Sequence, residues 1–119
     1  MFIKILCATD LNTTSNEAVK KAVQLAHQYN SKIIMLNVHE EFMTKEEMRM
    51  LRVSIDTMKL GFEKTALKAK EEMNEVIKKL HAEDIQVEYT IKEGKSNLVI
   101  CDEAKRIQAD LIIMGVSEK

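Results

Sequence analysis

The sequence contains no proline, no tryptophan, three glycines and two cysteines in 119 residues. The cysteines, Cys7 and Cys101, lie far apart and have no partner at metal-ligand or redox-motif spacing, so neither a disulfide framework nor a zinc site is expected. Eighteen basic residues against 19 acidic ones give a net charge of −1, which leaves no basic field for nucleic acid or for an anionic membrane surface. No apolar run approaches the roughly 20 residues of a membrane-spanning helix. We therefore expect a globular protein of the reducing cytoplasm, with neither nucleic acid nor membrane as partner.

The chain does contain an alternation of strand-type and helix-type segments, with 45% apolar and 31% charged residues. Continuous apolar segments are typical of strands buried on both faces, strict apolar–polar alternation of a half-exposed strand, and spacings of three and four of an amphipathic helix. In chain order the expected elements are a strand at 2–9, a helix at 14–29, a strand at 33–38, a helical stripe at 44–81, an alternating strand at 85–92, a helix at 96–107 and a strand at 110–115. The length fits one domain, residues 1–119, without an internal repeat or linker.

The stretch from Thr44 to His81 carries the strongest helical periodicity. Its apolar residues follow one another at spacings of three and four over 33 residues, from Met48 to Leu80. A straight helix of that length would measure roughly 50 Å, whereas a domain of this size is about 35 Å across. The helix should therefore either break near Gly61 or project and pair with another subunit, and we predict a break, or a poorly ordered segment, somewhere in residues 42–61.

The succession of elements predicts an α/β fold with a doubly wound, mostly parallel sheet and helices on both faces. The three continuous apolar segments should be central strands and the alternating segment an edge strand, and we predict the sheet order 3-2-1-4. This order places a topological switch point between the first and fourth strands, where ligands of such sheets bind. Asp10 and Gly115 follow those two strands and are therefore expected at the lips of a crevice.

Four short motifs resemble those of the universal stress protein family. They are Ile-Leu-Cys-Ala-Thr-Asp at 5–10, Asn-Val-His at 37–39, Glu-Gly-Lys-Ser at 93–96 and Asp-Leu-Ile-Ile-Met-Gly at 110–115. They occur in order and at normal spacing through nearly the whole chain, and the last motif is the most specific. The resemblance implies an adenine nucleotide alpha hydrolase-like fold, a homodimer and, in one of the family's two branches, ATP binding.

The resemblance also implies which residues would contact an adenine nucleotide. Thr9 and Asp10 stand at the end of strand one, where the family has an acidic residue that approaches the nucleoside. Val38 corresponds to a residue whose backbone meets the adenine. Met114 and Gly115 would open the phosphate loop, whose glycines let backbone N–H groups close on the phosphates. The resemblance implies no metal site in the chain itself.

The sequence departs from the family pattern after Gly115. Four residues follow, and the second and third glycines of the phosphate loop, the last helix and the fifth strand are absent. Residues 116–119, Val-Ser-Glu-Lys, resemble what normally follows that loop. The phosphate part of the site is therefore not encoded in these residues, and the fourth strand is expected to be an open edge that favours intermolecular pairing.

Each candidate residue also has a plain structural explanation. Asp10 can cap the helix that follows it, Val38 can be a core residue at a strand end, and Gly115 can serve only as a turn. The hydroxyl residues at 13–15 fit a helix cap as well as a phosphate contact, and Ser96 can cap the helix expected at 96–107. His39 lies near the crevice without a nucleophile or carboxylate pattern around it, so we expect a loop histidine rather than an acid or base.

Three functions follow from these patterns. The leading hypothesis is a non-enzymatic stress-response domain that binds ATP or a related adenine nucleotide at the ends of strands one and four. The alternative is a dimerising or adaptor protein that binds no nucleotide and acts through protein contacts, motivated by the 44–81 stripe and the open strand edge. ATP hydrolysis has the least support, because no general base is identifiable.

Overall fold

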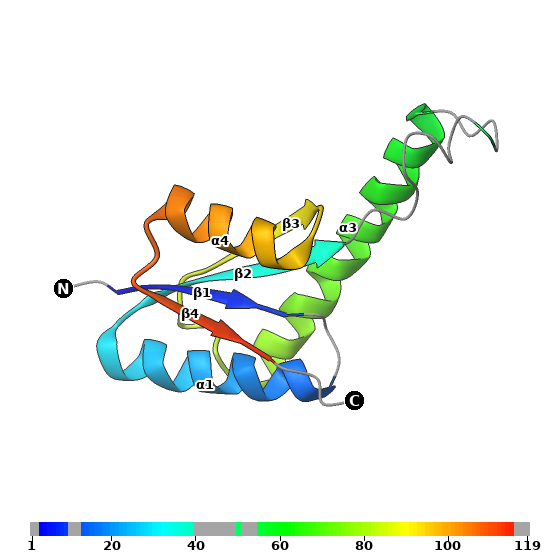
Figure 1. Ribbon diagram of the computed structural model, residues 1–119. Helices are drawn as coiled ribbons and strands as arrows, with labels where there is room; N and C mark the ends of the chain where they lie inside the picture. Colours follow the sequence, from blue (N-terminus) through cyan, green and yellow to red (C-terminus); the bar gives the residue numbers. More distant parts are fainter. Residues whose placement is uncertain (1–2, 10–12, 40–49, 51–54, 116–119) are drawn as a thin grey trace.

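The computed structural model describes residues 3–9, 13–39, 50 and 55–115 of the chain. Within these residues the elements succeed one another as β1 (Lys4–Ala8), α1 (Thr13–Tyr29), β2 (Lys32–His39), α3 (Ile55–Lys79), β3 (Val87–Glu93), α4 (Ser96–Ile107) and β4 (Leu111–Met114). The strands form one sheet in the order β3-β2-β1-β4, and every pair of neighbours runs parallel (Figure 1). The predicted α/β fold with sheet order 3-2-1-4 is confirmed.

Helices cover the sheet on both faces, with α4 on one side and α1 on the other (Figure 1). This division follows from the alternation of side chains along the two central strands. Ile5 and Cys7 of β1 face the layer formed by α1 and α3, whereas Leu6 between them belongs to a smaller cluster beneath α4. Both central strands are therefore buried on both faces, as their continuous apolar sequence predicts.

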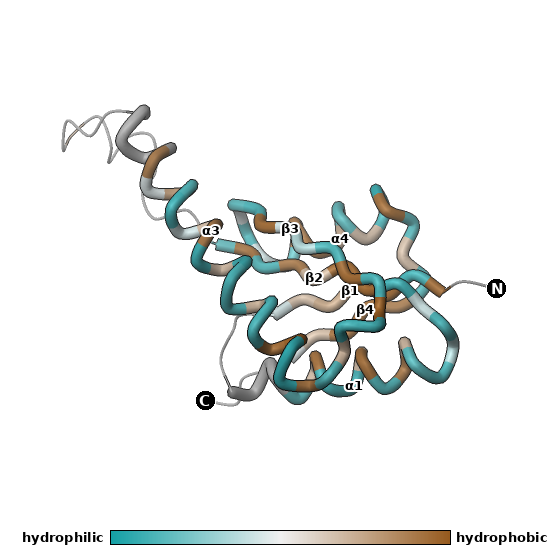
Figure 2. Tube along the Cα trace, turned by 180° about the vertical axis from the view of Figure 1, so that it is seen from behind, coloured by the Kyte–Doolittle hydropathy of each residue, from teal (hydrophilic) through white to brown (hydrophobic). Residues whose placement is uncertain are grey.

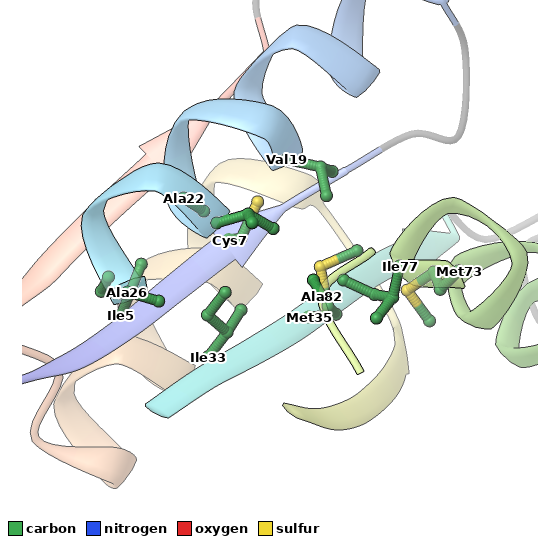
Figure 3. Close-up of a cluster of buried hydrophobic side chains, with 11 residues drawn as sticks. Ile5, Cys7, Val19, Ala22, Ala26, Ile33, Met35, Met73, Ile77 and Ala82 are labelled. Carbon is green, nitrogen blue, oxygen red and sulfur yellow. The ribbon is translucent and has the colours of Figure 1, made fainter. Parts of the chain in front are cut away.

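The larger core lies between the sheet and the helices α1 and α3 (Figure 3). Small side chains let α1 approach closely: Ala22 and Ala26 are 0% and 2% exposed over Ile5, Cys7 and their neighbours. Where α3 covers β2, the larger side chains Met73 and Ile77 fill the space. The small-residue face of α1 thus fixes the distance between helix and sheet.

Helix α3 runs without interruption through Gly61, so the predicted break at that residue is wrong. Its 25 residues correspond to roughly 37 Å, and its amino-terminal half extends past the sheet (Figures 1 and 2). A glycine costs a helix only about 1 kcal/mol, which the surrounding helical hydrogen bonds outweigh. The other residues in which a break was predicted, 42–54, lie outside the described part of the chain except for Met50, which is helical.

The two outer strands differ in burial. β3 alternates as predicted, and its Val87, Tyr89 and Ile91 pack against the larger core. The continuous apolar sequence of β4 predicts a central strand, whereas the described sheet ends with it. The expected open edge is therefore present among the described strands, and it carries exposed apolar side chains at Leu111, Ile112 and Met114.

Candidate functional site

A hollow of about 210 Å³ lies at the carboxyl ends of β1, β2 and β4, beside the first turns of α4. Thr9 and Val38 line it from the ends of β1 and β2, and Met114 and Gly115 line it from the end of β4. The fold thus brings four of the five predicted site residues around one space, at the switch point of the sheet. Asp10, the fifth, lies outside the described residues, and the assignment of all five to a nucleotide remains a prediction.

The strand register explains why these residues meet. Ala8, the last residue of β1, pairs with Leu36 of β2 on one side and with Met114 of β4 on the other. Because neighbouring parallel strands point the same way, their carboxyl ends meet at one edge of the sheet. The three strand ends therefore line the hollow together, and Ser96 and Ile100 of α4 line it as well.

A buried amide supports the end of β1. Asn37 is 3% exposed, and its Nδ2 donates a hydrogen bond to the carbonyl oxygen of Thr9 at 2.7 Å. The Thr9 amide in turn donates to the Leu36 carbonyl at 2.9 Å. Asn37 thus holds the point where the chain leaves β1. Sequence reasoning assigned it no role, although an amide within an otherwise apolar buried strand is the signal that could have found it.

The amino terminus of α4 borders the hollow. Ser96 is expected from the sequence to cap this helix, but Lys95 is the N-cap residue and makes no capping side-chain hydrogen bond. Ser96 is instead the first helical residue, and its position in the hollow's lining was missed. The first turn of α4 carries no acidic residue. The positive end of the helix dipole therefore adjoins the hollow without a neutralising carboxylate in that turn.

His39 lies on the other side of β2. It is the last residue of that strand rather than a loop residue, and its ring meets the Phe62 ring of α3 edge-on, with centroids 6.3 Å apart. Its buried Nε2 has no hydrogen-bond partner in the described structure. His39 does not line the hollow, so an acid–base role there has no geometric support.

Apolar atoms and hydroxyl groups dominate the site chemically. Among its lining residues, Thr9 and Ser96 supply hydroxyl groups, and Val38, Ile100 and Met114 supply apolar surface. Across the described residues, no group of three or more histidine, cysteine, aspartate or glutamate side chains is placed to hold a metal ion. None of the described helices has the length and hydropathy needed to cross a membrane.

The fold and the hollow together define a doubly wound α/β protein with a ligand-type crevice at the switch point of its sheet. Residues 1–119 match the family model described as "Universal stress protein family". The chain belongs to the universal stress protein family, and the resemblance carried by its four motifs is confirmed. No curated protein matches the chain significantly.

Solved structures of this family share the fold. Universal stress protein UspA from Lactobacillus plantarum superposes with a TM-score of 0.76 at 21% identity, covering 98% of this chain and 79% of that one. A universal stress protein in complex with cAMP superposes with a TM-score of 0.64 at 17% identity, covering 92% of this chain and 69% of that one. A family protein from Arabidopsis thaliana with AMP bound superposes with a TM-score of 0.55 at 21% identity, covering 96% of this chain and 76% of that one. These likenesses establish the architecture of the chain.

Proposed function

We propose that this chain is a stress-response domain that binds an adenine nucleotide at the carboxyl ends of β1, β2 and β4. The observation that carries the proposal is the hollow lined by Thr9, Val38, Met114 and Gly115, which are the residues that the family resemblance implies. Relatives with the same fold are described with cAMP and with AMP bound, which supports an adenine nucleotide as the ligand class.

The size and lining of the hollow favour the nucleoside part of such a ligand. Its volume of about 210 Å³ is below the roughly 300–1,000 Å³ of pockets that enclose drug-sized ligands. The base would pack on the apolar side chains of Val38 and Ile100, and the ribose would lie toward Thr9, the residue before Asp10 in the sequence. The phosphates would then extend past Gly115, near the uncapped amino terminus of α4.

The proposal includes binding without turnover, a homodimeric state and a cytoplasmic location. Binding without turnover is supported by the lining of the hollow, in whose described part no carboxylate or imidazole is available as a general base. The homodimer is supported by family membership. Cytoplasmic location is supported by the free thiol of Cys101, which is exposed on α4 and suits a reducing compartment.

Calorimetric titration of the purified chain with ATP, AMP and cAMP tests this function. If the hollow takes the nucleoside part, AMP and ATP bind with dissociation constants within about ten-fold of each other, because the phosphates add few contacts. Ser96→Glu places a carboxylate at the hollow and weakens binding at least ten-fold through charge repulsion. Gln86→Glu adds the same charge at the opposite end of the sheet and serves as the matched control. Absence of binding heat for all three nucleotides would refute the proposal for this chain.

A second candidate function is that of an adaptor acting through protein contacts without nucleotide. It is favoured by the exposed apolar side chains of β4 and by Leu60 and Leu67 on the outer part of α3, which are 59% and 61% exposed. Gly115→Val discriminates the two functions. It adds a branched side chain at a residue that lines the hollow and should weaken nucleotide binding under the first function, whereas partner capture by the adaptor should not change.

A further inference from the structure

We infer that Asn37 is a positioning residue for the hollow, because its side chain occupies the backbone acceptor that the amide of Val38 would otherwise use. The inference rests on the proposed function and names a further residue on which ligand binding depends. Asn37 lies in β2 between Leu36 and Val38, which both line the hollow, but it does not line the hollow itself. Its effect on a ligand therefore has to pass through the backbone beside it.

The register of β1 and β2 predicts one more backbone hydrogen bond at the carboxyl end of this strand pair. The Lys32 amide of β2 donates to the Ile3 carbonyl, just before β1, at 3.1 Å. Four residues further along β2, the Leu36 carbonyl accepts from the Thr9 amide at 2.9 Å. Because the backbone groups of every second strand residue point to the same side, the Val38 amide faces β1 as well. Its expected acceptor is the Thr9 carbonyl.

The side chain of Asn37 stands in place of that bond. Among the described residues, no backbone hydrogen bond joins the Val38 amide to the Thr9 carbonyl. The carbonyl accepts from Asn37 Nδ2 instead, at 2.7 Å. Since a carbonyl oxygen can only accept, this contact fixes the orientation of the side-chain amide, with Nδ2 toward Thr9. Within the described part of the chain, the Val38 amide is thus left without a backbone acceptor at the end of β1.

The amide of Val38 points toward the ends of the strands that line the hollow. Val38 lines the hollow together with Thr9 after β1 and Met114 in β4. In the sheet order, β1 lies next to β2 and β4 lies beyond β1, so a group that points from β2 toward β1 also points toward both strand ends. A ligand in the hollow can accept a hydrogen bond from the Val38 amide only while the Thr9 carbonyl does not compete for it. Asn37 removes that competitor.

The burial of the Asn37 side chain supports a role other than stability. The residue is 3% exposed, and its Oδ1 is buried without a hydrogen-bond partner in the described structure. A buried acceptor without a partner costs free energy that an apolar side chain would not cost. The preceding residues of β2, from Ile33 to Leu36, are all apolar and buried. A leucine, which has the same branched shape, would therefore suit the stability of the fold at least as well as this asparagine.

Hydrogen exchange of the ligand-free chain tests the inference directly. In the unmutated chain, the Val38 amide should exchange about ten-fold or more faster than the Leu36 amide, which lies within the paired part of β1 and β2. In Asn37→Leu the Thr9 carbonyl becomes available, so the exchange of the Val38 amide should slow about ten-fold or more. Met35→Leu is the matched control, because it changes a buried apolar side chain on the same face of β2. It leaves the exchange of Val38 unchanged.

Titration with AMP and urea denaturation of the same variants separate positioning from stability. Asn37→Leu should raise the AMP dissociation constant about ten-fold or more, because the Val38 amide is then bound to the chain itself. The urea midpoint should stay the same or rise, since the unpaired Oδ1 is gone. A purely structural role of Asn37 predicts the opposite, namely a lower midpoint with unchanged affinity. Met35→Leu should leave the affinity unchanged.

Two results would overturn the inference. One is a Val38 amide that is as well protected as the Leu36 amide in the unmutated chain, a comparison that does not depend on how well a variant folds. The other is an Asn37→Leu variant that binds AMP as tightly as the unmutated chain does. If the unmutated chain binds no nucleotide, the proposed function fails, and the exchange of the Val38 amide still decides whether Asn37 keeps that amide free.

Discussion

The two outer strands of the described sheet, β3 and β4, differ in the side chains that they place at its edges. On β3, every second side chain is polar or charged, and Glu88 and Lys92 lie on the face that α4 covers only in part. Lys32 of β2 pairs with Glu88 at 2.8 Å, and Lys92 lies 3.9 Å from the buried Glu103 of α4. On β4, four successive apolar residues occupy the same kind of position with no charge among them.

This difference indicates that the side chains of an edge strand, rather than its position in the sheet, determine whether another chain can pair with it. A second chain that paired with β3 would have to bring apolar side chains next to Glu88 and Lys92 and desolvate them. A second chain that paired with β4 would bury apolar surface and lose no charge–water contact. Among the described strands, the sheet therefore has one charged edge and one apolar edge.

The largest expected effect is a difference in stability loss between shortening a side chain at the centre of the sheet and shortening one on the outer strand β4. Leu6 of β1 is 0% exposed and is paired in register with Ile112 of β4, which is 43% exposed. Leu6→Ala should lower the free energy of unfolding by about 3 kcal/mol because it leaves a cavity between β1 and α4. Ile112→Ala should cost about 1 kcal/mol, because much of its side chain already meets water. Urea denaturation, at a concentration where both variants are monomeric, measures both values. Equal losses would show that the β4 edge is as well packed as the centre.

The next largest effect is the pH dependence of stability that the buried thiol of Cys7, in the central strand β1, should cause. Burial raises the pKa of its thiol from 9.0 to about 12, because the thiolate would be desolvated. Since the folded-state pKa lies above that of the unfolded chain, the neutral thiol's contribution to stability is complete below pH 9 and is lost as the pH rises toward 12. The loss amounts to at most about 1.4 kcal/mol per pH unit in this range.

Urea denaturation between pH 8 and pH 10.5, the latter about 1.5 units above the ordinary thiol pKa, measures this loss. Cys7→Ala should remove it, so that its unfolding free energy falls less steeply with pH than that of the unmutated chain. Cys101→Ala is the control, because it removes the other cysteine, which is exposed on α4. A slope that is the same with and without Cys7 would show that the thiol is accessible to water in the folded state.

The sheet and the strand ends could be predicted from the sequence because both depend on local periodicity. Continuous apolar runs marked β1 and β2, alternation marked β3, and the right-handed crossover then left few orders for the strands. That order alone placed Asp10 and Gly115 at the crevice. The family resemblance added Thr9, Val38 and Met114, three residues that line the hollow together with Gly115.

What the sequence did not predict depends on contacts between distant residues. The role of Asn37 depends on the distance between its amide and the Thr9 carbonyl, 28 residues away in the chain. Ser96 was expected to be a cap because its chemistry suits one, but α4 begins at that serine, with Lys95 as the N-cap. The break at Gly61 was predicted from the size of a compact domain, and α3 instead extends past the sheet. The error at Gly61 arose because the expected size of the domain was given more weight than the unbroken helical periodicity, which α3 follows.

The smallest expected effect tests whether charge is what protects β3. Glu88→Val breaks an ion pair whose carboxylate is 57% exposed, so the free energy of unfolding should change by no more than about 0.5 kcal/mol. Association should not increase either, because Lys92 remains on the same face. Glu88→Val combined with Lys92→Val should convert β3 into a second apolar edge. Each such β3 would recruit a further molecule, so larger assemblies should appear in sedimentation at concentrations where the unmutated chain forms none. If the double variant assembles no further than the unmutated chain does, the charges of Glu88 and Lys92 are not what prevents another chain from pairing with β3.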